Sequence, residues 1–247
     1  MLTVYGVTRS RASRIIWLCH EIGLPFRQVP VIQAYRLAAP DAPDAPLNTR
    51  SPEFLALSPQ GRIPVIRDGD LVLSESIACT IHLAQQHGGD LGGRDAAERA
   101  QCLQWGLFAA TEIEPDALTI LMLHRQGANG AQTEDRLLVA DATERLQHPL
   151  RVIEARLASD PHLVGGRFTV ADLNLAEVLR YAQVLPRIFD DLPALRRWLA
   201  ACQARPGFHR MWAARLEGIT VEFAFQIGAH QPRTGDDVAQ LDSVIPI

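Results

Sequence analysis

The hydrophobic positions in the first third of the chain alternate between two periods. Leu2–Tyr5 is a short run rich in β-branched and aromatic residues, which predicts a strand. Ser13–Ile22 carries apolar residues three and four apart, which predicts a helix that ends at Gly23. Arg27–Ile32 predicts a second short strand. The resulting β-α-β order predicts that the two strands are parallel.

The pattern then breaks and resumes. Residues 33–50 contain the run AAPDAPDAP, which cannot form a continuous helix or a central strand and predicts a long surface loop. Pro52–Leu57 predicts a short helix. Ile63–Arg67 and Leu71–Ser74 flank an Asp-Gly-Asp turn, a strong hairpin signal. Ser76–His87 predicts a closing helix, so the whole order is β-α-β-α-β-β-α.

After a glycine-rich joint at residues 88–93 the apolar spacing becomes helical. Apolar residues three and four apart predict helices at Asp95–His124, Glu134–Leu157, Val170–Val184 and Leu192–Ala204. Pro149 predicts a kink or a stop in the second of them. A short fifth helix is expected to start near Pro206.

The last part of the chain changes pattern again. Residues 215–247 predict an extended tail, and Ile219–Phe225 alternates apolar and polar positions as an ordered extended segment does. The chain is therefore expected to form two domains. Residues 1–88 make the α/β domain, and residues 95–247 make an all-helical domain with this tail.

Composition narrows the class of protein. The 247 residues are 47% hydrophobic and 21% charged, as in a folded globular protein. The net charge of −4 gives no basic field for nucleic acid or an anionic membrane, and no apolar run approaches the ~20 residues of a membrane span. All 24 basic residues are arginines, which excludes a lysine Schiff base.

The cysteines and histidines show no metal-ligand spacing. Cys19, Cys79, Cys102 and Cys202 lie far apart without a CxxC pair, which argues against a zinc site and a dithiol redox motif. The eight histidines contain no HxxxH pattern, so no metal is expected. Buried, reduced thiols are the simplest interpretation and predict a cytoplasmic protein. The N-terminal residues MLTVYGVTRSR lack the order of charge, apolar run and cleavage site of a secretory signal, which fits that prediction.

One local motif concerns folding rather than chemistry. Thr169 stands three residues before Asp172 at the start of a predicted helix. In a capping box these two side chains satisfy backbone N–H groups that the first helical turn leaves open.

Two further motifs suit a small zwitterionic ligand. Pro64 enters a predicted strand, where proline fits poorly, and a cis Ile63–Pro64 bond would turn the preceding backbone groups outward toward a peptide-like ligand. Glu75 and Ser76 directly precede a predicted helix. Glu75 can attract an α-amino group, while the Ser76 hydroxyl and free N–H groups can receive an α-carboxylate.

The first predicted β-α turn, from Thr8 to Arg14, carries the third motif that concerns ligand chemistry. Ser10 precedes a helix N-terminus, where a hydroxyl and the positive helix end can stabilise a thiolate. The alternative is that Ser10 or Ser13 is only a helix cap. Arg9, Arg11 and Arg14 lie beside them and either support such a thiolate or are solvated and ion-paired.

Together these motifs, in this order, resemble the glutathione transferase family over nearly the whole chain. The matching residues are Ser10-x-x-Ser13-Arg14, Pro59–Pro64, Glu75–Ala78 and Thr169-x-x-Asp172. The resemblance implies a thioredoxin-like α/β N-terminal domain plus an all-α C-terminal domain, a cis Ile63–Pro64 bond, glutathione as cosubstrate and a homodimer. It points to a serine-type, bacterial-looking member in which Ser10 activates the thiol.

The resemblance also implies where the ligands bind. Arg62, Ile63, Glu75 and Ser76 would hold glutathione, with Arg62 on its glycine carboxylate. The helix that carries Trp105, Phe108, Thr111 and Glu112 would face the pocket of a small hydrophobic electrophile. The alternative for Trp105 and Phe108 is core packing. The tail from residue 215 either narrows that pocket or packs elsewhere as structural cover.

The expected function is transfer of glutathione to a small electrophile, as in detoxification. Ser10 in place of cysteine makes glutathionyl transfer or dithiol exchange less favoured. The alternatives left open are a non-catalytic ligand-binding or interaction protein of the same fold, and glutathione-dependent disulfide reduction, dehalogenation or isomerisation.

Overall fold

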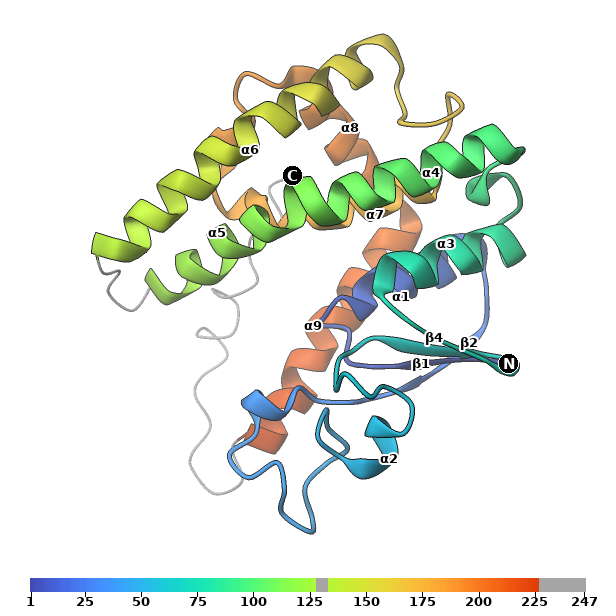
Figure 1. Cartoon of the computed structure of the whole chain (residues 1–247), viewed down its shortest axis with the longest axis vertical. Helices are drawn as coiled ribbons and strands as arrows, with labels where there is room; N and C mark the ends of the chain where they lie inside the picture. Colours follow the sequence, from blue (N-terminus) through green and yellow to red (C-terminus); the bar gives the residue numbers. More distant parts are fainter. Residues whose placement is uncertain (128–132, 227–247) are drawn as a thin grey trace. The chain divides into compact units, whose positions relative to one another are not determined.

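A computed structural model describes residues 1–127 and 133–226 of the protein (Figure 1). They form two compact units: Met1–Leu83 together with the helix that follows Arg205, and Ala84–Ala204. The last helix thus groups with the first unit, whereas the sequence-based division placed it in the second.

The first unit contains the predicted β-α-β-α-β-β-α order. Its elements are β1 (Leu2–Tyr5), α1 (Ala12–Ile22), β2 (Phe26–Val29), a 3-10 turn (Ala34–Arg36), α2 (Pro52–Leu55), β3 (Val65–Asp68), β4 (Leu71–Ser74) and α3 (Ser76–His87), whose end enters the second unit. The strands form one sheet in the order β2-β1-β3-β4. β1 and β2 are parallel, while β1–β3 and β3–β4 are antiparallel, which confirms the predicted parallel pair and hairpin.

Apolar periodicity explains why these elements form. α1 buries Ile15, Ile16, Trp17 and Leu18 almost completely, so most of its circumference is core rather than surface. It ends at Gly23, whose φ of +67° is the left-handed conformation that favours glycine.

A buried amide makes several of the hydrogen bonds that order the predicted loop at 33–50. The Asn48 side-chain NH₂ donates to the carbonyl oxygens of Pro40 and Pro46, each at 2.9 Å, and its Oδ1 accepts the Arg50 N–H at 2.9 Å. Asn48 is 1% exposed. Asn48 thus ties together a proline-rich segment with almost no secondary structure, beside backbone hydrogen bonds between Ile32 and the 47–49 stretch and an Arg50–Asp41 ion pair.

The second unit is helical, as predicted. Its elements are a 3-10 turn (Gly89–Gly92), α4 (Ala96–Phe108), a π-helical turn (Ala109–Ile113), α5 (Glu114–Gly127), α6 (Thr133–Ser159), α7 (Val170–Leu179), 3-10 turns at Arg180–Val184 and Pro186–Phe189, and α8 (Pro193–Gln203). None of the helices within the described ranges is both long and apolar enough to cross a bilayer.

The expectation of a stop at Pro149 is wrong, because α6 runs through it. A proline removes one helical hydrogen bond and crowds the preceding turn. On either side of it, however, Leu146, Leu150 and Ile153 are at most 1% exposed. Burial of this apolar stripe outweighs the local penalty and keeps the helix continuous.

The expectation of an extended segment at Ile219–Phe225 is also wrong. α9 spans Pro206–Gln226, so these residues are helical. Ile219 and Phe223 are four apart, a spacing that fits a helix as well as a strand, and no proline interrupts positions 207–226. The remainder of the predicted tail, 227–247, lies outside the described residues.

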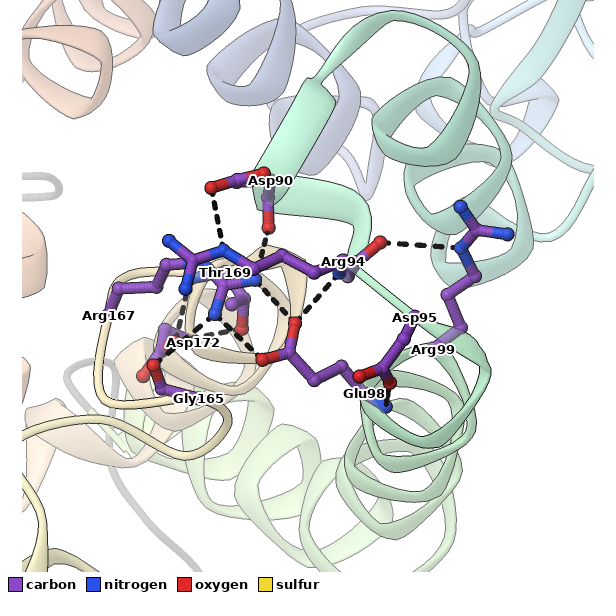
Figure 2. A network of polar contacts seen from close by, with 10 residues as sticks. Asp90, Arg94, Asp95, Glu98, Arg99, Gly165, Arg167, Thr169 and Asp172 are labelled. Carbon is purple, nitrogen blue, oxygen red and sulfur yellow. Dashed lines mark hydrogen bonds and ion pairs between the residues drawn. The ribbon is translucent and has the colours of Figure 1, made fainter.

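A network of charged side chains fixes the glycine-rich joint within the second unit (Figure 2). Glu98, near the start of α4, accepts two bonds from the Arg167 guanidinium, with Nη1–Oε1 at 2.9 Å and Nη2–Oε2 at 2.5 Å. It also accepts the Arg94 N–H at 2.7 Å. Arg167 further donates to the Asp90 carbonyl oxygen at 2.8 Å. The joint is therefore fastened to the loop that precedes α7.

We expect Glu98 to contribute to stability in acid. The hydrogen bond from Arg167, followed by that from the Arg94 N–H, lowers the pKa of Glu98 from 4.5 to about 2. Because the pKa is lower in the fold, the contribution is complete above about pH 4.5 and is lost as the pH falls toward about 2. As the pH falls from about 4.5 toward about 2, the free energy of unfolding of Glu98→Gln should therefore fall less than that of the wild type. Chemical denaturation at each pH measures it. Glu144→Gln, an exposed position on α6, is the control and should retain the wild-type slope.

Candidate functional site

The Ser10 side chain is held at the entrance to α1. Its hydroxyl donates to the Val7 carbonyl oxygen at 2.7 Å, and its oxygen accepts the Ala12 N–H at 3.1 Å. Ser10 thus helps to start the helix, as the capping alternative requires, and it remains half-buried rather than enclosed. A hydroxyl has one proton. Donation to a thiolate would therefore require that proton to turn away from Val7.

The rest of the turn is fixed from β2. The Gln28 amide donates to the Gly6 carbonyl oxygen at 2.8 Å and to the Thr8 hydroxyl at 3.3 Å. Gly6 has φ +143°, and an added Cβ would lie 3.4 Å from the Cβ atoms of both Ala12 and Ile63. The close packing at Gly6 places Ile63 directly beside the turn from Thr8 to Arg14, which we call the serine turn.

The peptide bond between Ile63 and Pro64 is cis, which confirms that expectation. β3 begins only at Val65, and among the described residues no hydrogen bond engages the backbone N–H or C=O of Ile63. Ser58 supports the preceding residue, because its hydroxyl donates to the Arg62 carbonyl oxygen at 3.0 Å. The Arg62 side chain is exposed. This segment therefore offers a ligand the backbone N–H and C=O of Ile63 and the guanidinium of Arg62.

Glu75 has the unusual backbone of the site. Its φ of +66° makes it the residue other than glycine that has a positive φ in the described chain, between β4 and the first residue of α3. The Glu75 side chain is exposed. Non-glycine residues in this conformation are uncommon and concentrate where function constrains the backbone.

Ser76 is buried and is joined to α1 by an arginine. The Arg14 Nη1 donates to the Ser76 hydroxyl oxygen at 2.8 Å, and Arg14 is 1% exposed. The three arginines of the turn thus differ, since Arg9 is half-buried and Arg11 exposed. Solvation is the wrong interpretation for Arg14. Its signal in the sequence is that the five residues after it, Ile15–Cys19, are all apolar.

Sheet register brings the three motifs together. Tyr5, which leads into the serine turn, pairs with Val65, the residue after the cis bond. Val65 pairs in turn with Ser74, the residue before Glu75. Three segments distant in sequence therefore leave the sheet at one end, where they present a hydroxyl, a backbone edge and a carboxylate beside two helix N-termini.

The cysteines are unsuited to nucleophilic chemistry. All four are free and buried, as predicted. Burial raises the pKa values of Cys19 and Cys79 to about 12, and it raises that of Cys102 as well. Thiols with such values hold almost no thiolate at neutral pH. In the described ranges, no group of three His, Cys, Asp or Glu side chains is arranged to hold a metal ion.

The predicted acceptor residues occupy the joint between α4 and α5. Trp105 is buried and meets the Phe108 ring edge-on at 5.3 Å, as the core-packing alternative expects. Thr111 and Glu112 are exposed in the π-helical turn, where the Thr111 hydroxyl donates to the Leu107 carbonyl oxygen at 3.1 Å. Other residues, among them Gln183, Phe189 and Gln203, line a cavity of about 470 Å³ in this unit.

Comparison with known proteins identifies the family to which the chain is similar. The family model for the glutathione S-transferase N-terminal domain matches residues 9–86, and that for the C-terminal domain matches residues 110–206. Glutathione S-transferase 3 of Zea mays is 33% identical over 86% of this chain and 94% of its own. A glutathione S-transferase of Hyoscyamus muticus is 31% identical over 87% of this chain and 98% of its own.

One similar solved structure contains a bound ligand. Glutathione S-transferase I from maize, in complex with an atrazine glutathione conjugate, has a TM-score of 0.71 and 27% identity, covering 87% of this chain and 97% of that one. These relatives come from plants, so they lend no support to the expected bacterial character. With both domain models matched in order and relatives aligned over most of its length, the chain belongs to the glutathione S-transferase family.

Proposed function

We propose that this glutathione S-transferase binds glutathione at the sheet end where the three motifs meet. The Ile63 backbone pairs with the ligand's peptide groups, and Glu75 pairs with its α-ammonium. Ser76 and the N-terminus of α3 receive the α-carboxylate, and Arg62 receives the glycine carboxylate. The observation that carries this proposal is the register that joins Tyr5, Val65 and Ser74 across three strands.

Ser10 acts on the sulfur in this proposal, which makes the enzyme serine-type. Its O–H turns from Val7 to the thiolate while its oxygen keeps the Ala12 N–H, so donation disrupts one hydrogen bond and leaves the helix start intact. The positive end of α1 adds to the effect. Lowering a thiol pKa of about 8.5 by about two units is worth ~2.7 kcal/mol. Burial, with a thiol pKa raised to about 12, makes Cys19 and Cys79 unsuited to act as the nucleophile.

The acceptor in this proposal is a small hydrophobic electrophile. The thiolate sulfur forms a bond to the electrophilic carbon, the leaving group departs with its bonding electrons, and the thiol proton passes to solvent. The atrazine conjugate bound by the maize relative is a product of this class. Trp105, Phe108, Thr111 and Glu112 are proposed to contribute to the acceptor pocket.

Assembly and location complete the proposal. We propose a homodimer, which is supported by Leu103 and Leu107, four apart on α4 and about half exposed, at 49% and 55%. The four reduced cysteines support a cytoplasmic location.

The proposed function is tested with glutathione and a Ser10→Ala variant. Reduced glutathione at 100-fold excess over its dissociation constant should stabilise the wild type by about 2.7 kcal/mol. Ser10→Ala should bind glutathione nearly as well, yet raise the pKa of the bound thiol by about one to two units. The measurement is thiolate absorbance against pH. An unchanged melting temperature in glutathione would contradict the binding site.

A Ser13→Ala control distinguishes an effect of the Ser10 hydroxyl from one of the nearby Ser13 hydroxyl. Ser13 is fully buried inside α1, and Ser13→Ala should leave the titration of the bound thiol in place. Coincident titrations of Ser10→Ala and the wild type would assign activation to Ser13, the arginines or the helix N-terminus instead.

A further inference from the structure

α9 is built into the first unit although it follows the whole helical domain in sequence. Arg205, just before it, donates through Nε to Glu21 at 2.8 Å, and the Phe208 ring meets Trp17 edge-on at 5.1 Å. At Gly207 the two backbones approach so closely that an added Cβ would lie 3.0 Å from the Glu21 Cα. α9 therefore runs along α1 from its C-terminal end toward its N-terminal end.

The next turns of α9 bring a buried cation to the serine turn. Arg215 is 4% exposed, and its Nη1 donates to the Thr8 carbonyl oxygen at 3.0 Å. Its guanidinium lies over the Trp212 ring at 5.5 Å, and Trp212 is stacked on Phe208 at 5.8 Å. The position of Arg215 is thus set by the same aromatic contacts that dock α9 on α1.

Thr8 is two residues before Ser10, and its neighbour Val7 supplies the carbonyl that Ser10 uses. Gln28 holds the turn from β2, through the Gly6 carbonyl and the Thr8 hydroxyl. Gln28 thus bonds the side chain of Thr8, and Arg215 bonds its backbone carbonyl oxygen. With both in place, the backbone that leads into Ser10 is held by two elements far from it in sequence.

We propose that Arg215 is a positioning residue for thiol activation, through which the C-terminal helix sets the geometry and charge of the serine turn. The inference rests on the proposed role of Ser10. Arg215 lies beyond residue 206, where the match to the family's C-terminal domain model ends, so neither domain model includes it. Its charge adds to those of Arg9, Arg11 and Arg14 and opposes that of Glu75. A buried cation near a thiolate favours the ionised form.

The test replaces Arg215 in the full-length chain. Arg215→Met keeps an unbranched apolar stem against Trp212 and removes both the donor and the charge. We expect the pKa of bound glutathione to rise by about one unit, from about 6.5 to about 7.5, so that the thiolate fraction and kcat/KM at about pH 7 fall about threefold and recover at high pH. The dissociation constant for glutathione should change less than about twofold, because Arg215 is not among the proposed ligand contacts.

The matched control is Arg210→Met. Arg210 is on the same helix and donates to the His20 carbonyl oxygen at 3.0 Å. His20 lies near the C-terminal end of α1, at the opposite end from the serine turn. Loss of this hydrogen bond should loosen α9 and lower the melting temperature of the protein. It should leave the pKa of the bound glutathione thiol unchanged. Arg215→Lys keeps a charge and a donor, and it should recover at least half of the pKa shift. It also serves as the readout if the methionine variant does not fold.

The outcomes separate the two proposals. If glutathione does not stabilise the wild type, the proposed binding site is wrong. If the wild type binds glutathione and lowers its thiol pKa, but Arg215→Met gives the same titration, only the role of Arg215 is overturned. An equal shift in Arg210→Met overturns it too, because the effect would then belong to the docking of α9 in general.

Discussion

Replacing Asp172 with alanine should lower the free energy of unfolding by about 4 kcal/mol or more, the largest stability effect expected in the chain. Asp172 is fully buried and accepts the Thr169 N–H at 2.8 Å and the Thr169 hydroxyl at 3.0 Å. It also accepts the Leu163 N–H at 3.1 Å and the Trp198 indole N–H at 2.8 Å. Alanine would leave four donors unsatisfied inside the second unit.

Chemical denaturation of matched variants tests this expectation. Asp172→Asn keeps one acceptor oxygen in the same place, so about half of the loss is expected. Asp160→Ala removes a carboxylate that also accepts two bonds, from the His162 N–H and from Arg156, but that is partly exposed. It should cost less than about 1 kcal/mol. Equal losses for Asp160→Ala and Asp172→Ala would contradict the account based on buried donors.

The elements that sequence predicts well are those with a local cause. The hairpin follows from the Asp-Gly turn, and α1 follows from apolar spacing that ends at Gly23, so both could be placed from a short window. The capping box at Thr169 and Asp172 is likewise local and is present. Its further partner Trp198 is not local, and the pattern alone could not reveal that Asp172 joins α7 to α8.

The failures arise where tertiary packing overrides a local rule. Pro149 should interrupt a helix, but the buried stripe around it keeps α6 intact. The alternation at Ile219–Phe225 fits a strand and a helix alike, and the structure has a helix. The docking of α9 on α1 depends on pairs such as Arg205 with Glu21, 184 residues apart, which single-sequence reasoning cannot see.

The candidate site shows the same division. Ser10, Ile63, Glu75 and Ser76 could be selected because each stands in a motif with a physical signature. The contacts around them are harder to predict. Arg14 belongs to the serine motif, but its burial and its hydrogen bond to Ser76 are not visible in the sequence. Arg215 resembles a surface arginine in the sequence, and its importance rests on burial and on a hydrogen bond to Thr8, 207 residues away.

Replacing Glu75 with alanine should abolish most glutathione binding with little harm to the fold. In the proposed site Glu75 is the partner of the ligand's ammonium, and loss of a charged hydrogen-bond partner costs about 1.5–3 kcal/mol, or roughly 10- to 100-fold in the dissociation constant. The exposed Glu75 side chain has little packing to lose in the free protein. Titration calorimetry with reduced glutathione measures the change. Asp70→Ala, at an exposed carboxylate in the β3–β4 turn, is the control and should bind as the wild type does.

A glycine at position 75 separates the backbone from the carboxylate. The φ of +66° costs a residue with a side chain about 1 kcal/mol, whereas glycine adopts it freely. Glu75→Gly should therefore lose as much glutathione affinity as Glu75→Ala while unfolding at a higher temperature than that variant. The strained backbone would then be a stability penalty that the protein retains in order to hold a carboxylate at the ligand's ammonium. If Glu75→Gly binds glutathione as tightly as the wild type, the carboxylate has no such role and the assignment of Glu75 is wrong.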